Sequence, residues 1–129
     1  MTTDSSQVTA HNSKTKSSNI KDRSYNFSLE IIKFVNGFPE KQVFKVIGNQ
    51  LLRSATSIGA NLIEAKASGS KKEFIRYYQI SLKSGDESQY WLSLLKDSYK
   101  NLSPRCDVLM GELKEICRML ASSIITLKR

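Results

Sequence analysis

The sequence predicts an all-α protein, an antiparallel up-down-up-down four-helix bundle with a disordered N-terminal tail. Apolar residues recur at steps of three and four through most of the chain, which is the period of an amphipathic helix. The breaks between these segments are short and contain Gly, Ser or Pro, so consecutive helices should pack as antiparallel neighbours. No segment shows the sustained alternation of apolar and polar residues that is typical of a half-buried strand.

Length and composition indicate one ordinary domain. The 129 residues are 40% hydrophobic and 25% charged, which is typical of a soluble protein. Residues 1–24 are polar, lack periodicity and contain the only histidine, His11, so we predict a disordered basic tail there and a bundle domain over residues 25–129. No apolar run is long enough to span a membrane and no secretory signal is visible, so we expect a cytoplasmic protein.

The first helix is expected to begin near Ser24 or Asn26 and to end at Gly37, because glycine is common just after the last residue of a helix. Pro39 can open the second helix, since a residue of the first turn needs no N–H group. The apolar face of the first helix comprises Phe27, Ile31, Phe34, Val35 and Phe38.

The second helix, from Pro39 to about Ala67, is predicted to be the central one. Its main apolar stripe comprises Phe44, Ile47, Leu51, Ala55, Ile58, Leu62 and Ala65. A second stripe beside it contains Gly48 and Gly59, and each glycine costs about 1 kcal/mol relative to alanine inside a helix. We therefore expect another helix to approach closely there, although the pattern also allows a break near Gly59.

Ser70 and Glu73 form a capping box that opens the third helix, which should reach about Leu102. The apolar stripe of this helix is small in the middle, at Gly85, which again indicates a close helix approach, and Trp91 lies off the stripe on a second apolar surface. The fourth helix should begin with Ser103 as N-cap and Pro104 in its first turn. Its stripe comprises Leu109, Leu113, Ile116, Leu120, Ile124 and Leu127.

The two cysteines, Cys106 and Cys117, both fall in the predicted fourth helix. At a rise of about 1.5 Å per residue they lie roughly 16 Å apart, well beyond the approximately 7 Å Cα limit for a disulfide. We predict two buried free thiols, which suits a reducing compartment.

The sequence holds no recognisable catalytic constellation. With its only histidine in the tail, the domain cannot assemble a Ser-His, Cys-His or His-metal arrangement, and it lacks a Gly-rich nucleotide loop and the Glu-x-x-His motif of di-metal bundles. Ser68 and Lys71 match the S-x-x-K pattern of serine acyl-enzymes but lack its companion motifs. We therefore expect no enzymatic activity, no metal and no cofactor.

Net charge is the strongest pointer to a partner. The chain carries a net charge of +8, and most of the excess belongs to the predicted bundle. Exposed cations beside Tyr77 and Tyr78 suit phosphate neutralisation and base stacking, although charge alone leaves a merely solvated face equally open. The cations around the bend between the second and third helices are Arg53, Lys66, Lys71, Lys72, Arg76 and Lys83.

Residues 50–65, QLLRSATSIGANLIEA, resemble the signature Q-L-x-R-[AS]-x-x-S-I-x-A-N-I-x-E of the four-helix-bundle family of 23S rRNA intervening-sequence proteins. Three further pieces agree in order, namely Phe38-Pro39, residues 70–75 (SKKEFI) and residues 87–92 (ESQYWL). The chain departs from the family at Gly59, where a proline is common, and at Ala65, where a glycine is usual. The turn between the second and third helices can therefore differ in shape.

The resemblance implies a homopentamer around a central channel, with a basic surface that contacts nucleic acid. Members of the family are often encoded within inserts in large-subunit rRNA genes, and relatives of the same fold serve the reverse transcriptases of diversity-generating retroelements. The expected function is therefore that of a non-enzymatic homo-oligomer that binds RNA or DNA. The alternative is a protein–protein scaffold or accessory subunit of a nucleic-acid enzyme such as a reverse transcriptase.

The resemblance also assigns roles to individual residues. Among the cations of the bend, Arg53, Lys66, Lys71, Lys72 and Arg76 are the expected contacts to a nucleic-acid backbone. Asn61 and Glu64 are expected to be structural, forming hydrogen bonds across helices or to a neighbouring subunit. A simpler role for Glu64 is an ion pair with Lys66, Lys72 or Arg53 at the helix end.

The second and third helices each carry apolar or small residues on a second face, more than a lone bundle needs to bury, and we expect sister copies to cover the excess. The residues expected in structural or subunit contacts are Gly48, Gly59, Asn61, Glu64, Gly85 and Trp91.

Overall fold

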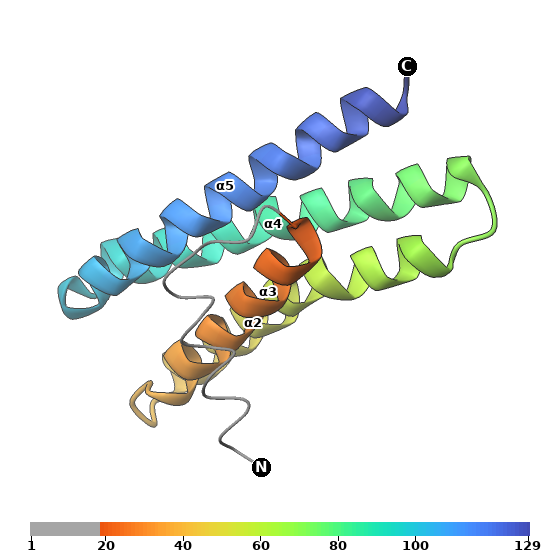
Figure 1. Ribbon diagram of the computed structural model, residues 1–129. Helices are drawn as coiled ribbons and strands as arrows, with labels where there is room; N and C mark the ends of the chain where they lie inside the picture. The colour runs from red at the N-terminus through yellow and green to blue at the C-terminus, as the bar shows by residue number, and fades with distance from the viewer. Residues whose placement is uncertain (1–18) are drawn as a thin grey trace, which may run out of the picture.

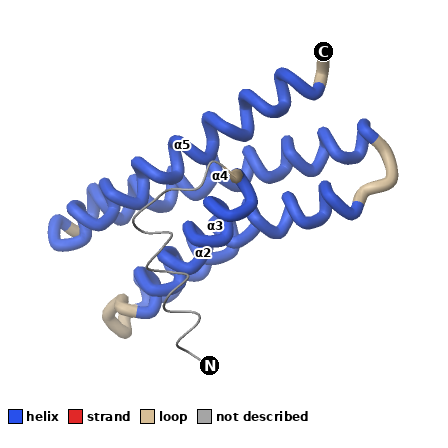
Figure 2. The backbone as a smooth tube through the Cα atoms, viewed as in Figure 1, coloured by secondary structure: helices blue, strands red, loops and turns tan. Residues whose placement is uncertain are grey.

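The computed structural model describes residues 19–129, which form four long helices and no strand (Figures 1 and 2). The predicted all-α bundle is therefore confirmed. The helices are α2 (Ile20–Asn36), α3 (Gln42–Ala67), α4 (Lys71–Ser98) and α5 (Ser103–Leu127), and a short 3₁₀ turn, η1 (Lys100–Leu102), precedes α5. None of these helices is long and apolar enough to cross a membrane.

Each helix packs against the next in the chain, and α2 also contacts α5, which closes the bundle. The core is apolar and α3 contributes most of its predicted stripe to it: Leu51, Ala55 and Ile58 have no exposed surface, while Ile47 at the edge is half-buried. At the end where α2 turns into α3, the rings of Phe34, Phe38, Phe44 and Tyr99 pack in a chain of neighbouring pairs.

The first helix begins earlier than predicted. The Asn19 side chain accepts hydrogen bonds from the backbone N–H groups of Lys21 (2.8 Å) and Asp22 (3.4 Å), so α2 starts at Ile20 instead of near Ser24 or Asn26. Ser24, which was predicted to lie at the end of the tail, is fully buried against α3. The first turn of α2 is polar apart from Ile20, so the periodicity of apolar residues in the sequence did not reveal it. Residues 1–18 of the predicted tail lie outside the described part of the chain.

Two other helix starts differ from the prediction. Pro39 lies in the connection, because its carbonyl accepts the N–H of Lys41 in a tight turn, and α3 begins only at Gln42. Ser103 is already helical and forms no side-chain cap, because η1 winds the chain before α5 begins and ends α4 at Ser98. α3 runs through Gly59 without a break.

The turn between α3 and α4 follows the predicted capping box. The Ser70 hydroxyl accepts the N–H of Glu73 at 3.1 Å. The Glu73 carboxylate accepts the N–H of Gly69 at 3.2 Å, one residue earlier than in a standard capping box. The substituted Ala65 is buried and helical, so this turn forms without the family's usual glycine.

The glycines differ in how closely another helix approaches them. A Cβ atom at Gly85 would lie only 2.6 Å from the Cys117 Sγ atom, and one at Gly48 would lie 3.2 Å from Val35 and 3.3 Å from Phe38. A Cβ atom at Gly59 would make an ordinary contact of 3.6 Å with Ser24. The expected close approach is therefore found at Gly48 and Gly85, within one chain, but not at Gly59.

Cys106 and Cys117 are free and buried, as predicted. Burial raises the pKa of the Cys106 thiol to about 11 and also raises the pKa of Cys117. Both thiols are therefore protonated at neutral pH, which makes them poor nucleophiles.

Replacing Gly85 by Ala tests the closest helix contact. The added methyl group overlaps the Cys117 sulfur, and overpacking of about 1–3 kcal/mol outweighs the roughly 1 kcal/mol gained in helix propensity. We expect Gly85→Ala to lower the free energy of unfolding in urea. In a double-mutant cycle with Cys117→Ala, the double variant should be more stable than the two single losses added together.

Gly111 provides the matched control, because it lies on the exposed face of α5 and a Cβ atom there meets nothing within 4 Å. Gly111→Ala should raise the free energy of unfolding by about 0.5–1 kcal/mol. Equal stabilisation by both alanines would contradict the close approach at Gly85.

Candidate nucleic-acid interface

Four of the predicted nucleic-acid contacts gather where α3 turns into α4. Lys66 lies in the last turn of α3, Lys71 and Lys72 open α4, and Arg76 follows one turn later. All four side chains are exposed. The three-residue connection brings them together, because it reverses the chain within one tight turn.

The C-terminal end of α5 lies at the same end of the bundle (Figure 1), since Leu127 lines one open pocket together with residues of the α3–α4 turn. Lys128 and Arg129 follow Leu127 directly and are exposed. We call residues 65–76 and 127–129 together the basic end. The prediction missed its last two cations, although the up-down topology already placed the end of the fourth helix beside that of the second.

Cations greatly outnumber carboxylates at the basic end. It contains six lysines and arginines but only one acidic residue, Glu73, whose carboxylate is engaged with the N–H of Gly69. None of the six cations forms an ion pair with any residue that the structure describes. The Arg76 guanidinium lies 5.3 Å from the centroid of the Tyr77 ring, a cation–π contact that holds it along the helix surface.

The other two predicted contacts lie away from this end. Lys83 is exposed on the face of α4 that Lys72 and Arg76 share, about 10 Å beyond Arg76. Arg53 lies about 20 Å before Lys66 along α3, beside Glu87 of α4. The six predicted residues therefore do not form a single cluster: four converge, Lys83 continues their face, and Arg53 belongs elsewhere.

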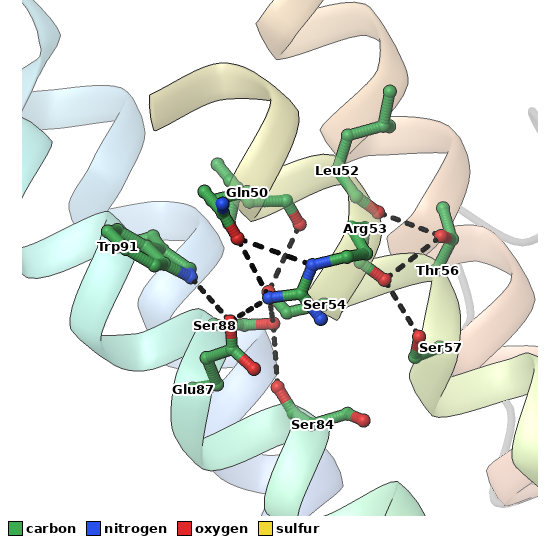
Figure 3. A network of polar contacts seen from close by, with 11 residues as sticks. Gln50, Leu52, Arg53, Ser54, Thr56, Ser57, Ser84, Glu87, Ser88 and Trp91 are labelled. Atoms are coloured by element: carbon green, nitrogen blue, oxygen red, sulfur yellow. Dashed lines mark hydrogen bonds and ion pairs between the residues drawn. The ribbon is translucent and has the colours of Figure 1, made fainter. Parts of the chain in front are cut away.

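Arg53 is part of a polar network that joins α3 to α4 (Figure 3). Its guanidinium donates to Gln50 at 2.9 Å and forms an ion pair with Glu87, while the Trp91 indole N–H donates to the same carboxylate at 3.0 Å. These contacts lower the pKa of Glu87 below its ordinary value, the hydrogen bond from Trp91 being the largest cause. The sequence did not predict the pairing of Arg53 with Glu87, because the two residues are 34 positions apart. The other two contacts, at spacings of three and four residues within one helix, were not predicted either.

Deeper in the interface between α3 and α4, the side chains in contact are small and polar (Figure 3). The hydroxyls of Ser54 and Ser88 lie 2.8 Å apart, and Ser88 also donates to the carbonyl of Ser84. Both serines are fully buried, so their hydrogen bonds are shielded from water. In this network Arg53 makes a structural contact between α3 and α4. The part of its side chain that stays exposed is available to a partner.

Two polar residues of the family signature form no hydrogen bond or ion pair with another helix within the described part of the chain. Asn61 donates to the Ser57 carbonyl within α3 at 2.8 Å, so it does not bridge to another helix of this chain. Glu64 is exposed and forms no ion pair with a described residue, and its suggested partner Arg53 binds Glu87 instead. Trp91 is half-buried against the core and donates its indole N–H to Glu87. Subunit contacts by these residues stay a prediction.

The S-x-x-K pattern has an ordinary structural explanation. The Ser68 hydroxyl donates to the Ala65 carbonyl at 2.6 Å and thereby closes the last turn of α3, while Lys71 starts the next helix. Within residues 19–129, no three His, Cys, Asp or Glu side chains gather as a metal site would require. The side chains at the basic end can thus neutralise an anion, but no nucleophile with its base is assembled there.

Comparison with known proteins agrees with the family resemblance of the sequence. The sequence model of the 23S rRNA-intervening sequence protein family matches residues 16–122. A crystal structure from Bacteroides thetaiotaomicron VPI-5482, of a protein with unknown function from the S23 ribosomal protein family, superposes with a TM-score of 0.77 at 34% sequence identity. The match covers 82% of this chain and 98% of that chain. No curated protein is significantly similar in sequence.

Replacing Glu87 by Gln tests the Arg53–Glu87–Trp91 network. Because the pKa of Glu87 is lowered in the folded state, its carboxylate stabilises the fold above its ordinary pKa of 4.5, and this contribution is lost as pH falls through the lowered value. We expect the wild type to lose more unfolding free energy between pH 5 and pH 3 than Glu87→Gln does, measured by urea titrations followed through Trp91 fluorescence and circular dichroism. Glu64→Gln, at an exposed carboxylate without a described ion pair, should follow the wild type; identical pH dependence of all three proteins would contradict the network.

Proposed function

Because the chain belongs to the 23S rRNA-intervening sequence protein family, we propose that it is a non-enzymatic homo-oligomer that binds nucleic acid, RNA in the first instance, through its basic end. The observation that carries this proposal is the group of six exposed cations around the α3–α4 turn and the end of α5. None of them is neutralised by a described carboxylate, whereas six cations elsewhere in the bundle are held in ion pairs.

Six cations that form no ion pair with a described residue repel each other at one end of the bundle and lower the stability of the folded protein. A bound polyanion would remove this repulsion. Phosphates of a nucleic-acid strand would neutralise the cations, and the release of condensed counterions would drive binding. Lys83 extends the array along α4, in line with Lys72 and Arg76. The name of the family makes RNA the first candidate partner.

Self-association is the second part of the proposal. Large apolar side chains stay exposed on the outer surfaces of the bundle, for instance Tyr25 (66%), Ile63 (61%) and Val108 (62%). Tyr25 and Ile32 lie two helical turns apart on α2 and are both exposed, so they share one outward face. Contacts between copies of the chain would cover such surfaces. The number five is taken from the resemblance to the family.

A protein scaffold or accessory subunit of a nucleic-acid enzyme is the second candidate function. It draws support from Tyr90, a residue that is 58% exposed and whose ring packs edge-on against the only tryptophan, Trp91. Aromatic side chains of this kind are enriched in protein interfaces. A protein partner that stays bound after nuclease treatment, and that is lost on Tyr90→Ala, would favour this function.

Charge reversal at the basic end tests nucleic-acid binding. For the variant Lys71→Glu/Lys72→Glu/Arg76→Glu we expect at least a tenfold loss of affinity for a labelled RNA. The slope of log affinity against log salt should also become shallower by about 0.7–0.9 for each phosphate contact that is lost. The matched control is Lys41→Glu/Lys45→Glu/Lys100→Glu, which changes the same total charge at the opposite end of the bundle. Equal effects of the two triple variants, or wild-type affinity that is independent of salt, would contradict the proposal.

The mass of the purified particle tests self-association. After nuclease treatment, light scattering coupled to size exclusion should give a multiple of 14.6 kDa. Without nuclease the particle should be heavier by the mass of the bound nucleic acid and should show a higher ratio of absorbance at 260 nm to that at 280 nm. A particle of 14.6 kDa at micromolar concentration would exclude a stable homo-oligomer.

A further inference from the structure

An open pocket of about 460 Å³ lies at the basic end, between the α3–α4 turn and the last residue of α5. Because it is open, a group bound there would contact the protein on one side and keep the other side toward solvent. Ala65, Phe74 and Leu127 give it apolar walls, and Lys66 and Lys71 bring positive charge to it. The other residues that line it are Ser68, Gly69 and Ser70.

Two of the backbone N–H groups of the turn are bonded to side chains of the turn itself. The Ser70 hydroxyl accepts the N–H of Glu73, and the Glu73 carboxylate accepts the N–H of Gly69. A phosphate at the very start of α4 would therefore lie close to the Glu73 carboxylate and be repelled by it. The side chains of Lys66 and Lys71 offer positive charge at the pocket, and its apolar walls suit an uncharged group.

The aromatic side chains indicate what kind of group this is. Phe74 lines the pocket and stacks on Tyr78 with ring centroids 4.9 Å apart and an angle of 23° between the ring planes. Tyr77, on the adjoining surface of α4, carries the Arg76 guanidinium against its ring. Flat rings beside cations are the common device by which proteins hold the bases of unpaired strands, because the phosphates bind the cations while each base stacks on a ring.

We infer that this pocket receives one unpaired nucleobase, stacked on Phe74, with the neighbouring phosphates bound by Lys66 and Lys71. The ligand class is then single-stranded nucleic acid, since the bases of an intact duplex are stacked on one another and cannot enter. This inference rests on the proposed function and specifies the substrate of the basic end.

Binding of one strand in two forms provides the test. A fluorescein-labelled RNA of twelve nucleotides without self-complementarity is titrated as a single strand and as its duplex, and anisotropy is recorded. We expect the wild type to bind the single strand at least tenfold more tightly. Phe74→Leu keeps an apolar side chain against Tyr78 but removes the aromatic face, so it should weaken single-strand binding about fivefold or more and leave duplex binding unchanged.

Phe38→Leu is the matched control, because Phe38 is also half-buried and in contact with aromatic rings, but at the opposite end of the bundle. It should leave both affinities unchanged, and circular dichroism should show that both variants are folded. As an independent readout, a strand carrying 4-thiouridine should crosslink to the tryptic peptide Glu73–Arg76, which contains Phe74.

The outcomes separate this inference from the proposed function. Equal, salt-dependent affinity for both forms of the RNA, unchanged by Phe74→Leu, would overturn the nucleobase pocket and leave the nucleic-acid interface standing. A crosslink found only outside residues 65–76 and 127–129 would overturn the pocket as well. No salt-dependent binding of either form would overturn both.

Discussion

The bundle depends on the close approach of α4 to its two neighbours. Gly85 has no side chain, so the Cys117 sulfur of α5 and the Ile58 side chain of α3 can both lie against the backbone of α4. One turn further along, the hydroxyls of Ser54 and Ser88 meet inside the core at 2.8 Å. Small residues in the middle of α4 therefore allow the close spacing of three helices, and a larger side chain at Gly85 would have to displace the Cys117 sulfur or widen that spacing.

The spacing set at Gly85 also decides which polar groups can meet. Arg53 reaches Glu87 only because the two helix surfaces are close, and the network orients Trp91 through the same carboxylate.

An ion pair holds α2 to α5. The Arg23 guanidinium donates two hydrogen bonds to the Glu112 carboxylate, and both side chains are mostly buried. The hydrogen bonds to Glu112 raise the pKa of Arg23, so this cation stays charged at every relevant pH. α2 starts about one turn short of the end of α3, since Ser24 lies opposite Gly59, and it leaves the basic end to three helices.

The candidate interface was only partly predictable. Lys66, Lys71, Lys72 and Arg76 are close in sequence on both sides of a turn, so their proximity follows from local structure. Arg53 was grouped with them because it precedes the same bend and belongs to the family signature, but its ion pair depends on a residue 34 positions away. Lys128 and Arg129 join the basic end through topology, and Asn61 satisfies itself within its own helix.

The sequence by itself determined the helical class, the four helices, the capping of α4 by Ser70 and the two free thiols, because these depend on periodicity, local hydrogen bonds and distances along one helix. Only the tertiary structure decided the start of α2 at Ile20, the packing of Cys117 against Gly85, the pairing of Arg53 with Glu87 and the pocket beside Phe74. These features arise between residues far apart in the chain. A one-dimensional pattern records which face of a helix is apolar, but it does not record which atoms of another helix meet that face, or at what distance.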